Sequence, residues 1–301
     1  MRTFLQRSLA LALALCCLPA CGAFDFHGQD LALRHDESAD TIDLKLHYKS
    51  VSAPKVIRHK TNTETGEKTG GMDYICELIE SIAAGKRYFM LVDNFFAFDL
   101  DKFESELNDD PSPETDAILA MIQTISVEHA TVSLDSRGRI SIDQHLRLRG
   151  ASSAMALLNR SLHQNLLKDH ASGSFDKGSA SFFDEQTRAA FVAEARAGRA
   201  WISWTGSDLV LDLPMTPQSG ARMLVEVVRE QAKVTEPHMQ DYLAQFFGLM
   251  GSVELKDNRL RMVTKAGEGG DLTLELEEDP REYNQTLLEA LRARDFTFSD
   301  Q

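Results

Sequence analysis

Two histidines are the first residues whose types and spacing could support chemistry. In the hairpin register favoured by the apolar positions, His129 lies opposite His145, with Asp143 on the same polar face. Directly opposed side chains have Cβ atoms about 4.5–5.5 Å apart. Two imidazoles at that spacing, with Asp143 as a diagonal third ligand, could hold zinc or copper. Arg147 and Arg149 continue the stripe and repel a cation, so we expect neighbouring histidines without a dedicated metal site.

Catalytic motifs give no further candidate. The sequence contains no HExxH, no cysteine cluster, no P-loop, no GxGxxG and no GxSxG. Ser52 and Lys55 fit the short SxxK pattern, but Pro54 between them disfavours the helix on which that chemistry depends. We therefore assign no catalytic residue and expect no bound cofactor.

One tryptophan is a candidate for recognition. In a hairpin expected to turn at Gly206–Ser207, Ile202 and Trp204 face one side of the first strand and Trp201 faces the other. A tryptophan on an open face offers a large apolar surface with one polar handle. We expect Trp201 to be exposed and to contribute to a partner surface.

The N-terminus indicates where the protein is located. Arg2 and Arg7 precede an apolar stretch, Leu9–Leu18, that is too short to span a bilayer as a stable helix. This arrangement is typical of a secretory signal. The stretch ends in the residues LPACG, in which a small residue stands directly before Cys21. That ending resembles the lipobox of bacterial lipoproteins.

The resemblance implies cleavage before Cys21, a diacylglycerol on its thiol and an acyl chain on its amine. Residues 1–20 would then be a removed signal peptide, and three acyl chains exceed the two signals that stable anchoring requires. Gly22 stands where an aspartate marks inner-membrane retention in enteric bacteria, so we expect the outer membrane. The alternative is ordinary cleavage after Ala20.

The charge balance limits the classes of partner. The chain has 46 Asp and Glu against 32 Lys and Arg, a formal charge of −14, which argues against a general affinity for nucleic acid. Hydrophobic residues make up 43% and charged residues 26%, as in ordinary globular proteins. Beyond the signal there is no long uncharged apolar run, which excludes a polytopic membrane protein.

The elements that must position these residues follow a repeated pattern of hairpin then helix. Alternating apolar positions predict three hairpins, with turns at Ser136–Gly138, Gly206–Ser207 and Asp257–Asn258. Apolar stripes at helical spacing predict helices at 72–85, 152–167, 184–197, 219–233 and from Asp279 onward. Such repeats predict an α+β fold with one or more antiparallel sheets and helices packed on one face.

The domain organisation is expected to follow the composition. Residues 21–40, the lipidated cysteine and an acidic stretch, are expected to form a flexible tether. The Gly- and Ser-rich segment 169–183 is expected to be a flexible loop between an N-terminal half, 41–168, and a C-terminal half, 184–301. The two halves belong either to one domain or to two.

These observations favour a membrane-anchored periplasmic or surface lipoprotein that acts as a non-catalytic binding, scaffold or accessory protein. Its expected partners are the membrane, through the lipid on Cys21, and a protein or lipid ligand, but not nucleic acid. Two alternatives stay open. One is a carrier of lipophilic molecules with a concave apolar sheet face, and the other is a hydrolase with dispersed catalytic residues.

Overall fold

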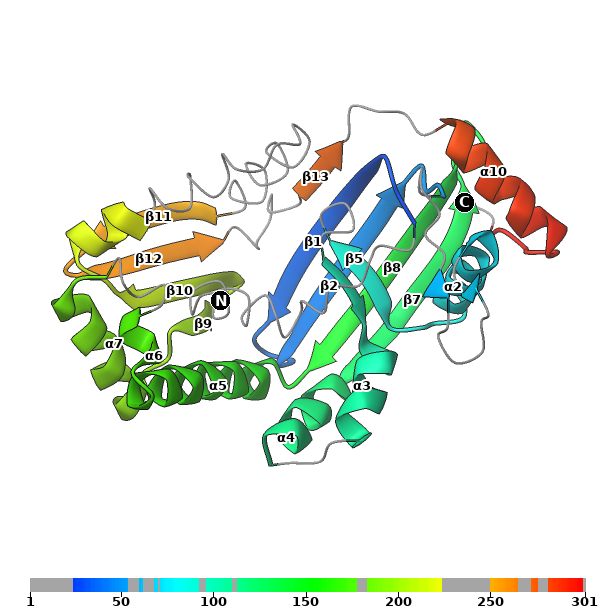
Figure 1. The fold of residues 1–301 in the computed structure, drawn as a ribbon. Helices are drawn as coiled ribbons and strands as arrows, with labels where there is room; N and C mark the ends of the chain where they lie inside the picture. Colours follow the sequence, from blue (N-terminus) through cyan, green and yellow to red (C-terminus); the bar gives the residue numbers. More distant parts are fainter. Residues whose placement is uncertain are drawn as a thin grey trace. The chain divides into compact units, whose positions relative to one another are not determined.

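The computed structural model has antiparallel sheets with helices against one face, which confirms the expected α+β class (Figure 1). It describes residues 24–53, 60–61, 68–69, 71–91, 96–109, 113–177, 183–223, 250–264, 272–275 and 281–299. The signal segment and Cys21 lie outside this range. Of the helices within it, none is both long and apolar enough to cross a membrane.

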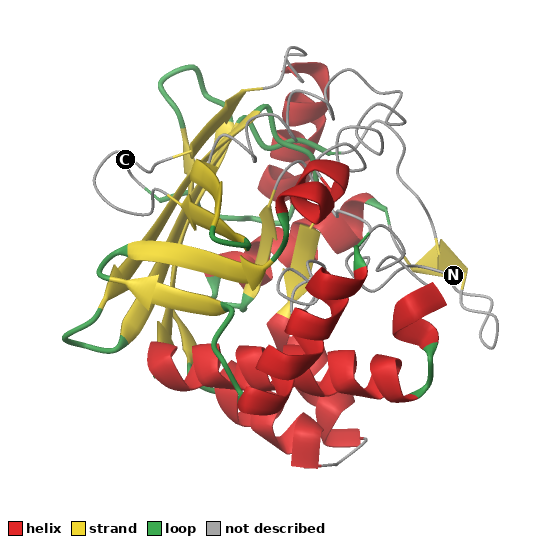
Figure 2. Ribbon diagram, turned by 90° about the vertical axis from the view of Figure 1, so that its left-hand side faces the viewer, coloured by secondary structure: helices red, strands yellow, loops and turns green. Residues whose placement is uncertain are grey.

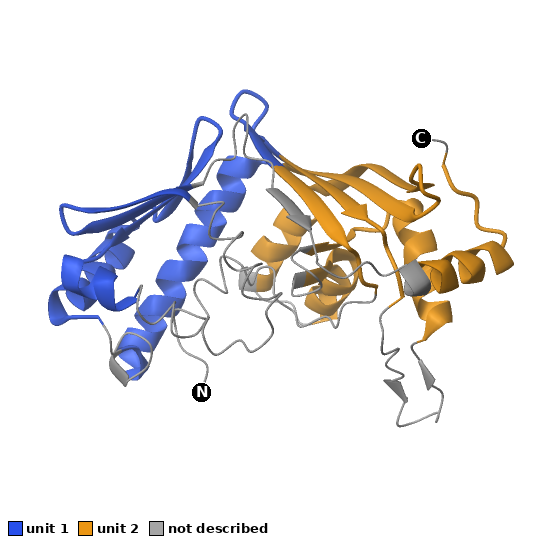
Figure 3. Ribbon diagram, turned by 90° about the horizontal axis from the view of Figure 1, so that it is seen from above, with its two compact units in different colours: residues 1–17, 33–42, 149–270 blue, residues 18–32, 43–148, 271–301 orange. Residues whose placement is uncertain are grey.

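The chain divides into two compact units (Figure 3). Unit 1 takes Leu33–Ile42 and Arg149–Gly270, and unit 2 takes Leu18–Ala32, Asp43–Leu148 and Asp271–Gln301. Strands and helices are distinguished by colour in Figure 2.

Unit 2 is built on a five-stranded sheet with the order β13-β1-β2-β8-β7. Its strands are β1 (Gly28–Asp36), β2 (Thr41–Lys49), β7 (Ile125–Leu134), β8 (Ile140–Arg149) and β13 (Leu272–Glu275). Two small antiparallel pairs are β3 (Lys60–Thr61) with β4 (Lys68–Thr69), and β5 (Tyr88–Leu91) with β6 (Phe96–Asp99). The helices are α2 (Met72–Ala83), α3 (Leu100–Asp109), α4 (Pro113–Ile122) and α10 (Arg281–Ala293).

The core of unit 2 joins the apolar face of the sheet to the apolar stripe of α2. Ile75, Ile79 and Ile82 of that helix are buried in the same cluster as Ile142 of β8. The helical spacing of these isoleucines predicted this face. Cys76, next to the stripe, is a buried free thiol, as expected for a core cysteine.

The hairpin of β7 and β8 has the predicted register. His129 lies opposite His145, and Val132 lies opposite Ile142. Gly138 has a φ of 72°, the left-handed conformation that the predicted three-residue turn requires. An irregularity between Val127 and His129 marks where the alternation of the first strand changes phase.

The prediction of a flexible tether over 21–40 is wrong for residues 24–40. Phe24 and Phe26 are each 1% exposed and pack edge-on against Tyr48, with ring centroids 5.9 and 5.2 Å away. Strand β1 follows and pairs antiparallel with β13. The buried Gln29 amide also donates a hydrogen bond to the Met90 carbonyl. These long-range contacts outweigh the acidic composition that favoured a solvated tether.

Unit 1 contains a four-stranded sheet with the order β11-β12-β10-β9. The strands are β9 (Ile202–Thr205), β10 (Asp208–Pro214), β11 (Met250–Lys256) and β12 (Arg259–Thr264). Trp204 pairs with Leu209 and Glu254 pairs with Arg261, as the two predicted turns require. Its described helices include α5 (Ala151–Ala171), α6 (Ser174–Lys177) and α7 (Glu185–Ala197).

The units are bounded differently from the halves expected from the sequence. The chain passes from unit 2 to unit 1 between Leu148 and Arg149, where β8 gives way to α5. Leu158, Leu162 and Leu166 of α5 are buried with residues of α7 and of the β9 region, which ties this helix to unit 1. The expected loop 169–183 is helical over much of 169–177. The helix expected at 219–233 is described, and helical, as far as Met223.

Candidate functional site

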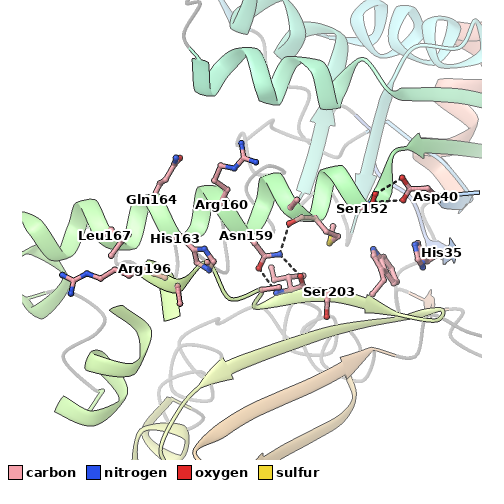
Figure 4. A pocket seen from close by; sticks show the side chains of 18 of the residues that line it. His35, Asp40, Ser152, Asn159, Arg160, His163, Gln164, Leu167, Arg196 and Ser203 are labelled. Carbon is pink, nitrogen blue, oxygen red and sulfur yellow. Dashed lines mark hydrogen bonds between the residues drawn. The ribbon is translucent and has the colours of Figure 1, made fainter. Parts of the chain in front are cut away.

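A groove of about 920 Å³ follows helix α5 in unit 1 (Figure 4). Its lining on that helix runs from Ser152 to Leu167 at spacings of three and four residues. Those positions share one side of a helix and extend over about 22 Å at 1.5 Å per residue. The other lining residues come from the end of α7, from β9 with the segment before it, and from the end of the β1–β2 hairpin.

Asp40 sets the position at which α5 begins. The helix follows Gly150, which has no side chain to cap it and adopts a left-handed φ of 74°. The Asp40 carboxylate instead accepts hydrogen bonds from the Ser152 backbone N–H at 2.8 Å and from its hydroxyl at 2.9 Å. The Asp40 carbonyl accepts from the N–H groups of Gly150 and Ala151. An acid at this end also complements the helix dipole.

Asn159 connects α5 to strand β9. Its side-chain oxygen accepts from the backbone N–H groups of Trp201 at 2.6 Å and Ile202 at 3.0 Å. Its amide donates to the carbonyls of Ile202 at 2.7 Å and Met155 at 2.8 Å. All these bonds are made by a side chain that is 7% exposed, so Asn159 fixes the wall of the groove.

His163 lies one turn further along α5 and is 6% exposed. Its ring meets that of Trp201 edge to face, at a centroid distance of 4.4 Å. Burial lowers the pKa of its imidazole, while a hydrogen bond with the Arg199 backbone acts in the opposite direction. Such a bond favours the charged ring because the ring donates it. Nε2 has no partner in the described structure, so the donor is Nδ1 and the neutral ring keeps a lone pair on Nε2.

The hairpin end of the groove is aromatic. Trp204 of β9 and His35 of β1 stack with ring centroids 4.8 Å apart and planes 13° from parallel. Nδ1 of His35 makes a 2.7 Å hydrogen bond with the Gly206 carbonyl, which fixes the imidazole over the indole. The Trp204 Nε1–H is buried and, among the described residues, meets no acceptor. A ligand in the groove could supply one.

The two ends of the groove differ in charge. Arg160 of α5 and Arg196 of α7 line it and are exposed, and in the described part of the chain no acid pairs with either. Glu37 and Asp40 line the hairpin end. In a chain with a formal charge of −14, each of these arginines is a local positive charge suited to an anionic group.

The contacts of His163 bear on what chemistry this arrangement can support. A hydroxyl nucleophile would need a hydrogen bond to its base, and within the described residues none reaches His163 Nε2. The groove is lined by the rings of His163 and Trp204, two guanidinium groups and an apolar wall. Few polar groups set in an apolar cleft are typical of ligand sites.

The expectation that Trp201 is exposed is wrong. Trp201 is 3% exposed and packs edge-on against Phe191 as well as His163. Its Nε1–H donates a 3.0 Å hydrogen bond to Glu194 of α7. The face of the strand opposite Trp204 is thus covered at this position by α7, so Trp201 stabilises the groove from behind.

The histidines identified in the sequence lie on the polar face of the unit 2 sheet, around a hollow of about 580 Å³. His129 and His145 are opposite each other, but Asp143 accepts a 2.8 Å hydrogen bond from His47 of β2. His145 Nε2 contacts Asp43 at 2.6 Å, and that carboxylate also accepts from Arg147 at 2.8 Å. Within the described ranges, no three or more His, Cys, Asp or Glu side chains are placed to hold a metal ion.

The His47–Asp143 pair should make stability depend on pH. The hydrogen bond that the His47 ring donates to the Asp143 carboxylate raises the pKa of His47 above 6.5, although burial opposes it. A raised folded-state pKa gives stabilisation that is complete below about pH 6.5 and lost as the pH rises through that pKa. Asp143→Asn should therefore lower the free energy of unfolding more at pH 5.5 than at pH 8.5, by up to about 1 kcal/mol for this partly exposed pair.

Urea unfolding at both pH values measures this difference. Asp116→Asn, at an exposed position of α4, is the matched control and should show no pH-dependent loss. An equal loss at both pH values for Asp143→Asn would contradict the assignment.

Comparisons with protein-family models, curated proteins and solved structures found no match to this chain. The assignment of the groove as a candidate site therefore depends on its geometry alone. Sequence patterns missed Asn159 and His163, which lie four residues apart beside the leucine stripe of α5. The sequence signal for these residues was a pair of polar positions next to an apolar helical stripe. Polar residues exposed to solvent give the same pattern, so the signal did not distinguish them.

Proposed function

We propose that this chain is a lipid-anchored, non-catalytic binding protein of the bacterial cell envelope, which holds its ligand in the α5 groove of unit 1. The single observation that carries the binding role is the groove itself. Two of its lining side chains carry a buried nitrogen atom that has no hydrogen-bond partner in the described structure, His163 Nε2 and Trp204 Nε1. Buried polar groups are normally hydrogen-bonded, so unpaired ones in a cleft point to a missing partner.

The anchoring part of the proposal rests on the sequence. The LPACG ending of the apolar N-terminal stretch supports acylation of Cys21. The position after the cysteine supports the outer membrane as its destination, with the folded units facing the periplasm or the cell surface.

The described structure favours binding over the two alternatives. A lipophile carrier needs an open apolar face, but the apolar faces of the five-stranded and four-stranded sheets are occupied by helices and other buried core residues. A hydrolase needs a nucleophile beside its base. The rings of His47 and His145 contact carboxylates, and among the described residues no hydroxyl hydrogen-bonds to either ring.

Anilinonaphthalene sulfonate, an aromatic anion, is a suitable probe of the groove. The chain contains two tryptophans, Trp201 behind the groove and Trp204 in its lining, so indole fluorescence reports on this site. We expect the dye to bind the folded protein and to receive excitation energy from the indoles. The double variant Arg160→Ala with Arg196→Ala should weaken binding about 10-fold, since each guanidinium contributes a charge-assisted contact.

A matched control is Arg292→Ala, because Arg292 is an exposed arginine of α10 in the other unit. Circular dichroism must show that each variant is folded, since the dye also binds partly unfolded states. Absence of energy transfer, or equal binding by the double variant, would contradict the assignment of the groove.

A further inference from the structure

Strand β9 has a free edge in the described sheet. The sheet order β11-β12-β10-β9 places β9 at its end, with β10 as its only described neighbour. In an antiparallel pair, alternate residues direct both backbone groups toward the partner strand, and those between direct them away. Asp212 donates to the Trp201 carbonyl at 2.8 Å, and Ser203 pairs with Val210 in the same register. Residues 202 and 204 therefore direct their backbone groups outward.

Side chains already bond backbone groups on both sides of Trp204. Asn159 binds the N–H and the carbonyl of Ile202 through its carboxamide, as a neighbouring peptide unit would. His35 binds the carbonyl of Gly206. Between them, the N–H and carbonyl of Trp204 have no hydrogen-bond partner in the described structure. The groove along α5 passes this position, because Ile202, Ser203 and Trp204 all line it.

We propose that the ligand of this groove is an extended polypeptide segment that pairs with the free backbone of Trp204 as an added strand. This inference rests on the proposed binding function and gives it a ligand class. Addition of a strand to an exposed sheet edge is a recurrent way of recognising peptides, in which main-chain hydrogen bonds give affinity. The residue opposite Trp204 exchanges both hydrogen bonds with it.

The dimensions and charges of the groove fit such a segment. A length of about 22 Å accommodates about six or seven extended residues at about 3.3 Å each. The ligand residue opposite Trp204 places its side chain on the same face as the indole, where Met155 and Ala156 offer an apolar wall. Acidic ligand residues near Arg160 or near Arg196 complete the match, so binding weakens as salt concentration rises.

A second copy of the sheet is a poorer occupant of this edge. Asn159 and His35 already bond the positions on either side of Trp204, so a long strand from another sheet could not pair along the whole edge. Any occupant can therefore pair its backbone only at Trp204, which suits a single short segment better than the edge of a whole sheet.

Two substitutions at one position separate backbone pairing from side-chain contact. Trp204→Pro removes the outward N–H, and proline is tolerated on an edge strand when the missing N–H faces away from the ladder. Trp204→Phe keeps the N–H and an aromatic ring. Both variants lose the indole Nε1–H, so comparing them isolates the backbone contribution. We expect peptide binding by Trp204→Pro to be at least about 10-fold weaker than binding by Trp204→Phe, because a backbone hydrogen bond and its pairing geometry are lost.

The probe is a random heptapeptide library displayed on phage and selected against the full-length protein in mild detergent. Selected sequences are then made as acetylated, amidated peptides, and their affinities are measured by fluorescence anisotropy. A series of peptides is then made in which one backbone nitrogen at a time is methylated. The peptide methylated at the residue opposite Trp204 should no longer bind. This arm uses the wild-type protein, so it decides the proposal even if Trp204→Pro does not fold.

The outcomes separate this inference from the function beneath it. Failure to select any peptide, or peptides indifferent to N-methylation and to Trp204→Pro, overturns strand addition. If the protein self-associates and Trp204→Pro abolishes that association, the occupant of the edge is a second copy and the peptide proposal is overturned. If the sulfonate dye still binds in the groove, the binding function stands and the peptide class is wrong; if neither binds, both are wrong.

Discussion

Replacement of Cys21 with alanine is expected to reduce incorporation of fatty acid into the protein to background. The thiol of Cys21 is the proposed site of the diacylglycerol, and cleavage before this residue depends on that modification. A protein that loses all its acyl chains loses about 0.8 kcal/mol of membrane affinity for each buried methylene. Metabolic labelling with a fatty-acid analogue, followed by mass spectrometry of the N-terminus, measures both acylation and cleavage.

Cys16 and Cys17 provide matched controls within the same apolar stretch. Neither is preceded by the small residue that the lipobox requires, so Cys16→Ala and Cys17→Ala should leave acylation intact. A Cys21→Ala protein that still matures and carries acyl chains would contradict the lipoprotein assignment. So would a wild-type protein with an unmodified N-terminus after Ala20.

Truncation of Trp201 should be among the most destabilising single substitutions in unit 1. Trp201→Ala removes a nearly fully buried indole that contacts Phe191 and His163, together with its hydrogen bond to Glu194. Replacement of a large buried aromatic side chain by alanine costs about 3–5 kcal/mol, because the cavity collapses only partly. Urea unfolding followed by the fluorescence of Trp204, then the sole tryptophan, measures the change in unit 1.

Tyr74 of α2, which is 49% exposed, is the control for a large aromatic residue at the surface. Tyr74→Ala should change the free energy of unfolding by less than about 0.5 kcal/mol. If Trp201→Ala lowers the free energy of unfolding by less than about 1 kcal/mol, the indole is not buried. It would then lie at the surface, as the strand alternation in the sequence predicted.

The His–Asp contacts of unit 2 show how tertiary partners change the surroundings of a pair of histidines predicted from the sequence. His129 and His145 are cross-strand neighbours, as predicted. The acid that could have joined them, Asp143, is held by His47, while Asp43 binds His145 and Arg147 together. Strand β2 lies between β1 and β8 in the sheet, and it supplies both His47 and Asp43. Its contribution could not be read from the hairpin alone.

The sequence by itself determined the local architecture. Side chains alternate faces along a strand with a period of two, so paired residues must agree in phase across a turn of known length. That condition was sufficient to predict His129 opposite His145, Trp204 opposite Leu209 and Glu254 opposite Arg261. The apolar stripe of α2 and the end of α7 at Gly198, which adopts a left-handed φ of 69°, are similarly local.

Only the tertiary structure decided which surfaces are covered. Phe24 and Phe26 are buried because Tyr48 packs against them, and Trp201 is buried because α7 lies over it. The groove likewise depends on residues distant in sequence, since Asn159 and His35 reach β9 from α5 and from β1. Burial is a property of such partners. Periodicity within a segment specifies which side chains share a face, but not what lies against that face.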